Sequence, residues 1–306
     1  MKKLLVLFGF FSFFLGHTQI QIPKEFNFNT PFVNAENRLV ILPPKATDKF
    51  FNVGLPYFDE NAGYTFKLFG TLVPENGKLI YKPAETNIIA RWQNLGLQVA
   101  ALSDQHVTGF KLPETASFLQ HYKSKRPEND VLVDKYSFMN GGGASALALK
   151  GLEKLKESGF KSEKFYFELA YAYNALGKFA QGEETVTEAA KNGFSNELFI
   201  KEKHYAMLNQ NKFSEAADYL TANFKHFKTA SYKSESIINQ ISKFYNAPDL
   251  ENAEKWIDIY KKEIGQDQYK VHVDKFEKAL KEQKKIRMAQ SSSGRFSVRK
   301  TVFLYL

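Results

Sequence analysis

The chain has 306 residues, which corresponds to roughly two domains at about 150 residues each. Hydrophobic residues make up 43% and charged residues 25%, a balance that is typical of globular proteins and not of disordered ones. Cysteine is absent, which excludes disulfide scaffolds, thiolate metal sites, cysteine nucleophiles and a lipidated N-terminal cysteine.

The formal charge of +9 is concentrated at the two ends of the chain. Lys2 and Lys3 contribute +2, and residues 281–300 carry seven basic side chains against Glu282 alone, which gives +6 and leaves +1 for the rest. Because nucleic-acid binding needs a basic patch on a folded face, we expect no nucleic-acid partner. Residues 289–306 are interpreted as a basic, Ser-rich tail.

The N-terminus has the pattern of a secretory signal peptide. Lys2 and Lys3 precede an apolar run over residues 4–15, and small residues follow at the two positions that a signal peptidase recognises. The run is about twelve residues long, which is short of the roughly twenty needed to span a bilayer. We therefore expect a signal peptide over residues 1–18, no transmembrane segment after its removal, and a secreted or periplasmic location.

Residues 24–140 are predicted to form a small β-rich domain, with a sandwich as one candidate arrangement. Partial alternation of apolar residues on both sides of Pro74-Glu75-Asn76-Gly77 predicts a β-hairpin, because Asn-Gly tolerates the positive φ angles of a tight turn. Residues 88–102 fit either a strand or a helix.

Further predictions cover residues 106–143. Residues 106–112 and 130–138 are predicted to be extended, and Pro113 is placed at the start of a short helix. The sequence Asn140-Gly141-Gly142-Gly143 interrupts the pattern, and it is interpreted as the boundary to the next domain.

From residue 144 onward the periodicity is helical, and the sequence contains an internal repeat. Phe160 and Phe194 follow similar segments and are 34 residues apart. Phe179 and Phe213 follow another pair of similar segments and are also 34 residues apart. Two independent landmarks with one spacing indicate stacked structural units.

The 34-residue period, with two helices in each period, resembles the tetratricopeptide repeat. The first full unit spans residues 163–196, and the family's large, small and aromatic positions are filled there by Tyr166, Leu169, Ala170, Tyr173, Gly182, Val186 and Ala189. Small residues let paired helices approach closely, and large ones fill the groove between them.

The resemblance extends over residues 144–288. A second unit follows the first and departs from the family at Lys203 and His204, and a third begins near Ser234 after a three-residue insertion. Before the first full unit only a second helix is recognisable. Residues 268–288 resemble the capping helix that such arrays need.

The resemblance implies a superhelix whose first helices line a concave face and bind an extended peptide or a helix. The side chains expected on that face, taken unit by unit, are Phe167, Tyr171 and Asn174, then Lys201, Tyr205 and Asn209, then Ile238, Tyr245 and Asn246. The alternative is that these are ordinary amphipathic surface positions, or positions covered by the N-terminal domain.

Some members of the family clamp a C-terminal carboxylate with Lys and Asn at set positions. Tyr171, Tyr205 and Ser242 stand where such Asn residues are expected, so this activity is not carried over to the chain.

Motifs for catalysis are missing from the sequence. The six histidines show no helical zinc-protease spacing, and there is no Gly-x-Ser-x-Gly nucleophile elbow. His204 falls in a helix-packing position, where a structural histidine is the favoured interpretation. We therefore expect no catalytic residues, no metal site and no cofactor.

These observations predict an α+β protein in which a small β-rich domain is followed by an α-solenoid of tetratricopeptide-like helix pairs. The predicted function is non-catalytic binding of a protein or peptide partner in the cell envelope or the secreted space. Two alternatives stay open. One is glycan or nutrient capture by aromatic residues of the β-rich domain, and the other is an unrecognised hydrolase in that domain.

Overall fold

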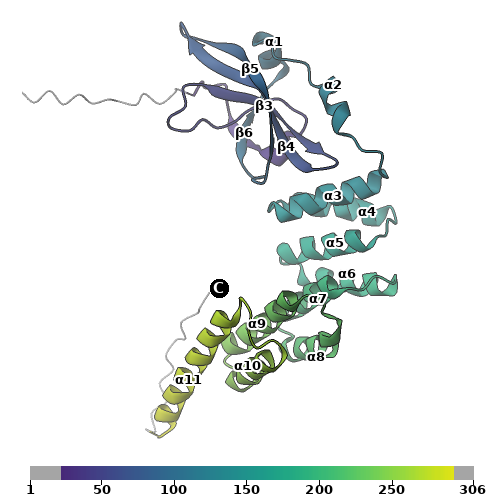
Figure 1. The fold of residues 1–306 in the computed structure, drawn as a ribbon, viewed down its shortest axis with the longest axis vertical. Helices are drawn as coiled ribbons and strands as arrows, with labels where there is room; N and C mark the ends of the chain where they lie inside the picture. Colours follow the sequence, from purple (N-terminus) through teal and green to yellow (C-terminus); the bar gives the residue numbers. More distant parts are fainter. Residues whose placement is uncertain (1–21, 293–306) are drawn as a thin grey trace, which may run out of the picture. The chain divides into compact units, whose positions relative to one another are not determined.

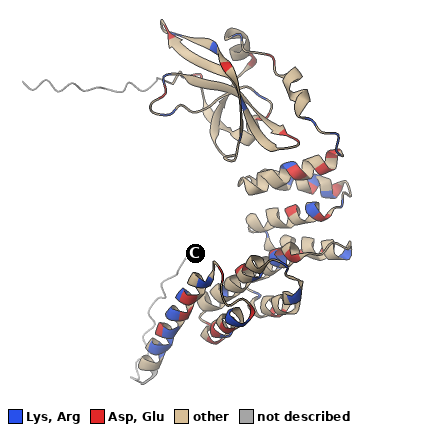
Figure 2. Cartoon of the chain, in the orientation of Figure 1, with Lys and Arg blue, Asp and Glu red and all other residues tan. Residues whose placement is uncertain are grey.

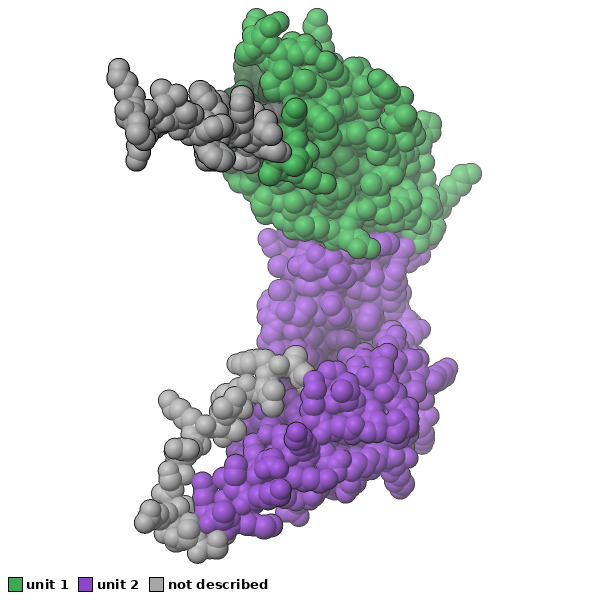
Figure 3. Space-filling model, turned by 60° about the vertical axis from the view of Figure 1, so that its left-hand side comes forward, with its two compact units in different colours: residues 1–126 green, residues 127–306 purple. Residues whose placement is uncertain are grey.

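The computed structural model describes residues 22–292, and the predictions for the signal peptide and for residues beyond 292 lie outside this range. The chain divides into two compact units, residues 1–126 and residues 127–306 (Figures 1 and 3). The first is built on a β-sheet and the second on helices, so the α+β prediction is confirmed.

The first unit contains one antiparallel sheet of six strands in the order β1-β6-β2-β3-β4-β5. The strands are β1 (Phe28–Pro31), β2 (Val40–Ile41), β3 (Phe51–Asp59), β4 (Gly63–Glu75), β5 (Lys78–Arg91) and β6 (Gln98–Ala101), with a 3₁₀ turn, η1 (Phe32–Ala35), after β1. All six strands belong to one sheet and not to a two-sheet sandwich.

The predicted hairpin is confirmed as the β4–β5 connection. Glu75 pairs with Lys78, and the two residues between them, Asn76 and Gly77, have φ angles of 50° and 76°. Asparagine and glycine are the residues that adopt positive φ at least cost, which is why this dipeptide closes a two-residue turn.

Two glycines allow the long strands to bend. The pairing register shifts beside Gly54 and beside Gly70. A Cβ atom at Gly54 would lie 2.2 Å from the Phe66 ring, and one at Gly70 would lie 2.2 Å from the Lys82 carbonyl oxygen. No larger residue fits at either position, so the β-bulges depend on glycine.

The segment after the sheet is helical where the sequence predicted an extended chain. Residues 106–112 fall in and after helix α1 (Asp104–Gly109), because the Ser103 side chain accepts from the backbone N–H of His106 and caps the helix. The short helix predicted after Pro113 is present as α2 (Ala116–Leu119), followed by the 3₁₀ turn η2 (Gln120–Tyr122).

The second unit is an array of helices that pack consecutively along the chain (Figure 1). The helices are α3 (Glu128–Gly141), α4 (Ser145–Glu157), α5 (Glu163–Ala175), α6 (Phe179–Lys191), α7 (Glu197–Asn209), α8 (Phe213–Asn223), α9 (Ala230–Asn246), α10 (Leu250–Glu263) and α11 (Lys270–Ser292), with a 3₁₀ turn, η3 (Phe224–His226), after α8.

The turns inside the helix pairs repeat one hydrogen bond. Ala144, Lys178, Lys212 and Asp249 each donate their backbone N–H to the carbonyl of the fifth residue before them, at 2.8–3.1 Å. These donors are separated by 34, 34 and then 37 residues. The repeat and the three-residue insertion before the third unit are therefore both present in the backbone.

The hydrogen bond from Ala144 shows that the helical array begins earlier than the sequence predicted. Residues 130–138 lie in α3 and are not extended, and Gly143, with a φ of 78°, closes the α3–α4 turn in the place that Gly177 takes in the next pair. The glycine-rich segment is therefore an inter-helix turn and not a domain boundary. The division between the units falls between Arg126 and Pro127.

Phe160 and Phe194 occupy matching positions in the backbone of the array. Phe160 and Phe194 each donate their backbone N–H to a carbonyl five residues earlier, at 3.1 and 3.0 Å. Both rings also pack on α5, but from opposite sides in sequence: Phe160 lies before α5 and contacts Phe165 at 5.7 Å, and Phe194 lies after it and contacts Tyr166 at 5.8 Å.

The far end of the array differs from the repeats before it. Helix α9 has 17 residues where α5 and α7 have 13, and α11, with 23 residues, packs on α9 and α10 in the position of a cap. Within residues 22–292, no helix combines the length and the apolar character needed to cross a membrane.

Basic and acidic residues alternate along α11 (Figure 2). Lys281 pairs with Glu277 at 2.9 Å, and Lys284 pairs with Glu254 of α10. Local acidic partners therefore neutralise part of the basic segment that the sequence places near the C-terminus.

Candidate functional site

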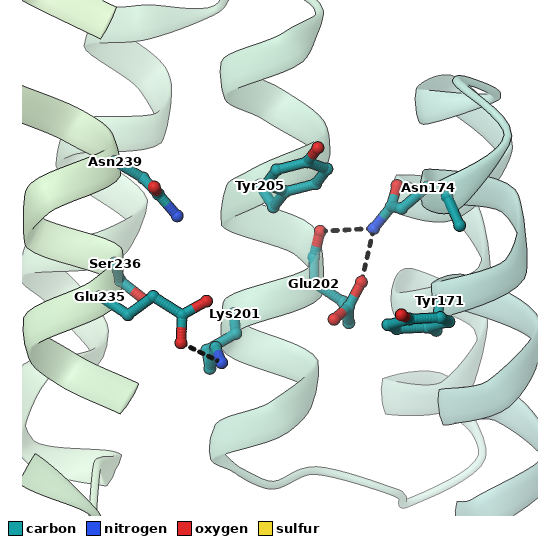
Figure 4. A pocket seen from close by; sticks show the side chains of 9 residues that line it. Tyr171, Asn174, Lys201, Glu202, Tyr205, Glu235, Ser236 and Asn239 are labelled. Carbon is teal, nitrogen blue, oxygen red and sulfur yellow. Dashed lines mark hydrogen bonds and ion pairs between the residues drawn. The ribbon is translucent and has the colours of Figure 1, made fainter. Parts of the chain in front are cut away.

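A hollow of about 270 Å³ lies across α5, α7 and α9, the first helices of three consecutive pairs (Figure 4). It is lined by Tyr171, Asn174, Ala175, Lys201, Glu202, Tyr205, Glu235, Ser236 and Asn239. We call this set the groove pocket. Four of the nine side chains expected on the concave face line it, namely Tyr171, Asn174, Lys201 and Tyr205.

The two tyrosines of the groove pocket occupy the same repeat position on neighbouring helices. Tyr171 is 36% exposed and Tyr205 is 42% exposed, which is high for large side chains in a folded array. Tyr171 packs against Phe167 with ring centroids 6.3 Å apart, and Tyr205 packs edge-on against Phe179 at 6.0 Å. Phe167 thus supports Tyr171 from behind and does not line the groove pocket itself.

Asn174 and Glu202 are joined by two hydrogen bonds. Asn174 Nδ2 donates to the backbone carbonyl of Glu202 at 3.0 Å and to its Oε2 at 2.8 Å. Burial raises the pKa of Glu202, and the Asn174 bond and the nearby Lys201 charge act in the opposite direction. The Glu202 carboxylate is therefore held in place by an amide while its environment disfavours the charge.

Lys201 is engaged on the other side of the groove pocket. Its Nζ lies 2.7 Å from Glu235 Oε2 and 4.4 Å from the centroid of the Tyr232 ring. This ion pair links α7 to α9. It also leaves the Lys201 ammonium neutralised by Glu235.

Asn174 belongs to the helix interface as much as to the groove pocket. The residue is only 4% exposed, and a Cβ atom at Gly182 of α6 would lie 2.3 Å from its Oδ1. Its amide therefore spans the space between α6 and α7, and the glycine makes room for it.

Three other predicted positions lie away from the groove pocket. Tyr245 is 6% exposed, packs against Phe276 of α11 at 5.5 Å, and accepts a hydrogen bond from Gln283 Nε2 at 2.7 Å. Ile238 is buried in the same core. The prediction that these two face the groove is wrong, because α11 covers that side of α9. Asn209 accepts from Lys243 Nζ at 2.9 Å and does not line the groove pocket.

The acidic and polar residues of the groove pocket were not predicted from the sequence. Glu235 and Asn239 stand 34 residues after Lys201 and Tyr205. The third unit was aligned with a shift of three residues so that its core positions match, and this shift hid the relationship. The repeat also marks Glu202, because a glutamate, Glu168, stands at the same position one period earlier.

His204 is a packed structural residue, as its sequence position predicted. It is 1% exposed, and its Nε2 lies 3.0 Å from Gln240 Oε1 on α9. Burial lowers the pKa of His204 to about 4, and the Gln240 bond opposes this shift. Among the described residues, no group of three or more histidine, aspartate or glutamate side chains is placed to hold a metal ion.

The aromatic residues of the first unit pack largely against one another. Phe32 stacks on Trp92 with centroids 4.9 Å apart, and Tyr57 packs against Phe118 and Tyr122 at 5.3 and 4.7 Å. These contacts account for the aromatic rings as core and give no specific support to a sugar-stacking surface.

No protein-family model matches the chain, and no curated protein matches it either. A function for the chain therefore has to be inferred from the side chains of the helical array.

Proposed function

We propose that the helical array binds an extended peptide or a helix of a partner protein, without catalysis, and that it does so in the cell envelope or the secreted space. The observation that carries the proposal is the groove pocket, which three consecutive first helices share and which two exposed tyrosines flank.

The chemistry of the groove pocket supports a peptide as the ligand. Tyr171 and Tyr205 offer a large contact area at a low cost in side-chain entropy. The Asn239 amide can donate to and accept from a peptide backbone. The volume of about 270 Å³ is below the roughly 300–1,000 Å³ of sites that enclose a whole small molecule, and it suits a side chain that projects from a longer chain.

The repeat supports the same proposal. The 34-residue period and its recurring turn bond agree with the resemblance to tetratricopeptide repeats, which bind peptides on the face formed by their first helices. The location follows from the signal-peptide pattern of residues 1–18, and it directs the search for a partner to envelope and extracellular proteins.

Selection of peptides tests this proposal. A phage-displayed library of random dodecapeptides is selected on the full chain, and the retained peptides are measured against Tyr171→Ala combined with Tyr205→Ala. We expect at least a tenfold loss of affinity in this variant. Leu176→Ala is the control, because Leu176 is 39% exposed on the same array but does not line the groove pocket. Retained peptides that bind the tyrosine variant as well as the wild type would contradict the proposal.

A further inference from the structure

The groove pocket has an unequal charge balance. Its lining includes two carboxylates, Glu202 and Glu235, and one ammonium group, Lys201. Because Lys201 and Glu235 are paired at 2.7 Å, they neutralise each other. The Glu202 carboxylate therefore carries the remaining negative charge.

Glu202 lacks a cationic partner within the described residues. Its Oε2 accepts from Asn174, and no lysine or arginine nitrogen of residues 22–292 lies within ion-pair distance of the carboxylate. Figure 4 shows Glu202 between Asn174 on one side and Lys201 on the other, with the Lys201 ammonium turned to Glu235. A partly buried carboxylate that is bonded only to a neutral amide gains free energy when a cation approaches it.

The walls of the groove pocket suit a cation with an aliphatic stem. Tyr171 lies on α5, and Tyr205 lies three residues after Glu202 on α7. Each tyrosine ring packs against a further aromatic residue. The faces of tyrosine rings attract ammonium and guanidinium groups, and the rings also contact the methylene groups of long side chains.

We infer that the groove pocket receives a lysine or arginine side chain of the bound peptide, with its cationic group on the Glu202 carboxylate and its stem between Tyr171 and Tyr205. This inference rests on the proposed function, and it names the chemistry that the groove selects. An acidic side chain or a C-terminal carboxylate is disfavoured at the same place, because it would meet Glu202 while Lys201 is occupied by Glu235.

The repeat provides a matched control for Glu202. Glu168 is the same residue one period earlier and accepts the same two bonds, from Asn140, but it is 5% exposed and does not line the groove pocket. Glu168→Gln therefore removes a carboxylate from an equivalent Asn–Glu pair while every side chain that lines the groove pocket is kept.

The test uses peptides selected on the full chain as described above. We expect lysine or arginine to be enriched at one position of those peptides that depend on Tyr171 and Tyr205. A synthetic peptide with that lysine acetylated should bind the wild type about tenfold more weakly than the unmodified peptide, the fold-change expected for a hydrogen bond to a charged group. Glu202→Gln should abolish the difference between the two peptides, and Glu168→Gln should preserve it.

The outcomes separate this inference from the proposed function. Tyrosine-dependent peptides without an enriched basic position, or equal binding of the acetylated and unmodified peptides to the wild type, would overturn the inference and leave the groove as a peptide site. A tenfold preference that persists in Glu202→Gln would also overturn it. If no selected peptide depends on Tyr171 and Tyr205, both the inference and the proposed function fail. The comparison of the two peptides on the wild type decides the question even if Glu202→Gln does not fold.

Discussion

Asn174 binds Glu202 through the same pair of hydrogen bonds that Asn140 makes to Glu168, 34 residues earlier. In both pairs the asparagine Nδ2 donates to the glutamate backbone carbonyl at 3.0 Å and to the carboxylate at 2.8 Å. Each pair joins the first helix of one unit to the first helix of the next. The Asn–Glu pair is therefore a polar link that recurs with the repeat and adds to the apolar packing of the helices.

Removing the asparagine of the buried pair should destabilise the array. Asn140 is 4% exposed and Glu168 is 5% exposed, so Asn140→Ala leaves a buried carboxylate without its donor. We expect the free energy of unfolding to fall by about 2–3 kcal/mol, measured by urea denaturation. Asn209→Ala, at a more exposed amide outside these pairs, should cost less than about 1 kcal/mol.

A double-mutant cycle separates this link from the packing around it. Combining Asn140→Ala with Glu168→Ala removes both polar partners, so the combined loss should be smaller than the sum of the single losses by about 1–2 kcal/mol. Single losses that add within about 0.5 kcal/mol would show that the two side chains do not stabilise each other.

Gly151 is required by the contact between α3 and α4. A Cβ atom at this position would lie 2.0 Å from Cζ of Tyr136, so Gly151→Ala forces the ring or the helix to move. We expect a loss of about 1–3 kcal/mol in the free energy of unfolding despite the better helix propensity of alanine.

Gly141 is the matched position for that experiment. It also lies in a helix, and a Cβ atom there meets nothing within 4 Å. Gly141→Ala should therefore raise the free energy of unfolding by up to about 1 kcal/mol. Equal effects of the two substitutions in urea denaturation would contradict the close approach of Tyr136 to α4.

Gly177 is required by its backbone conformation and not by crowding. Its φ angle is 71°, and a Cβ atom there meets nothing within 4 Å. Gly177→Ala should lower the free energy of unfolding by about 1 kcal/mol, the cost of placing a side chain in the left-handed region. Asn211 holds the same place in the next pair with a φ of 63°. Asn211→Gly should therefore leave the free energy of unfolding unchanged or raise it slightly, and both variants are measured by urea denaturation.

His204 should make the array sensitive to acid. Its pKa is lowered to about 4 in the folded protein, mainly by burial, from a usual value of 6.5. Between these values the unfolded chain binds a proton that the folded chain does not, so the free energy of unfolding falls as the pH falls from about 6.5 to 4. The loss from this residue should be about 2–3 kcal/mol between pH 7 and pH 4.5.

The matched measurement compares two histidine variants at both pH values. His204→Gln keeps an amide that can bond Gln240, and it should remove the loss that His204 contributes. His226→Gln, at an exposed histidine of η3, should leave the pH dependence close to that of the wild type. A wild-type pH dependence that survives in His204→Gln would show that this histidine does not titrate as its burial requires.

Much of the groove could be predicted from repeat positions alone. Tyr171 and Tyr205 share a repeat position, and both line the groove pocket. Tyr245 was misplaced because the pattern of α9 does not reveal that α11 packs over it, and Phe276 and Gln283 bury it. Glu202 was missed because its partner Asn174 lies 28 residues away on another helix.

The amino-acid sequence is sufficient to predict the features that depend on neighbouring residues. The Asn76-Gly77 turn follows from the φ angles that two adjacent residues must adopt, and the 34-residue period follows from landmarks that recur along the chain. Gly143 shows where this stops, because a glycine-rich segment fits an inter-helix turn and a domain boundary equally well. Tertiary packing, in contrast, makes residues 128–141 helical, since Val131 and Val133 fit a strand locally and packing against α4 and α5 selects the helix. It also decided which carboxylate faces the groove, because burial is set by the helices that pack alongside and not by the segment itself.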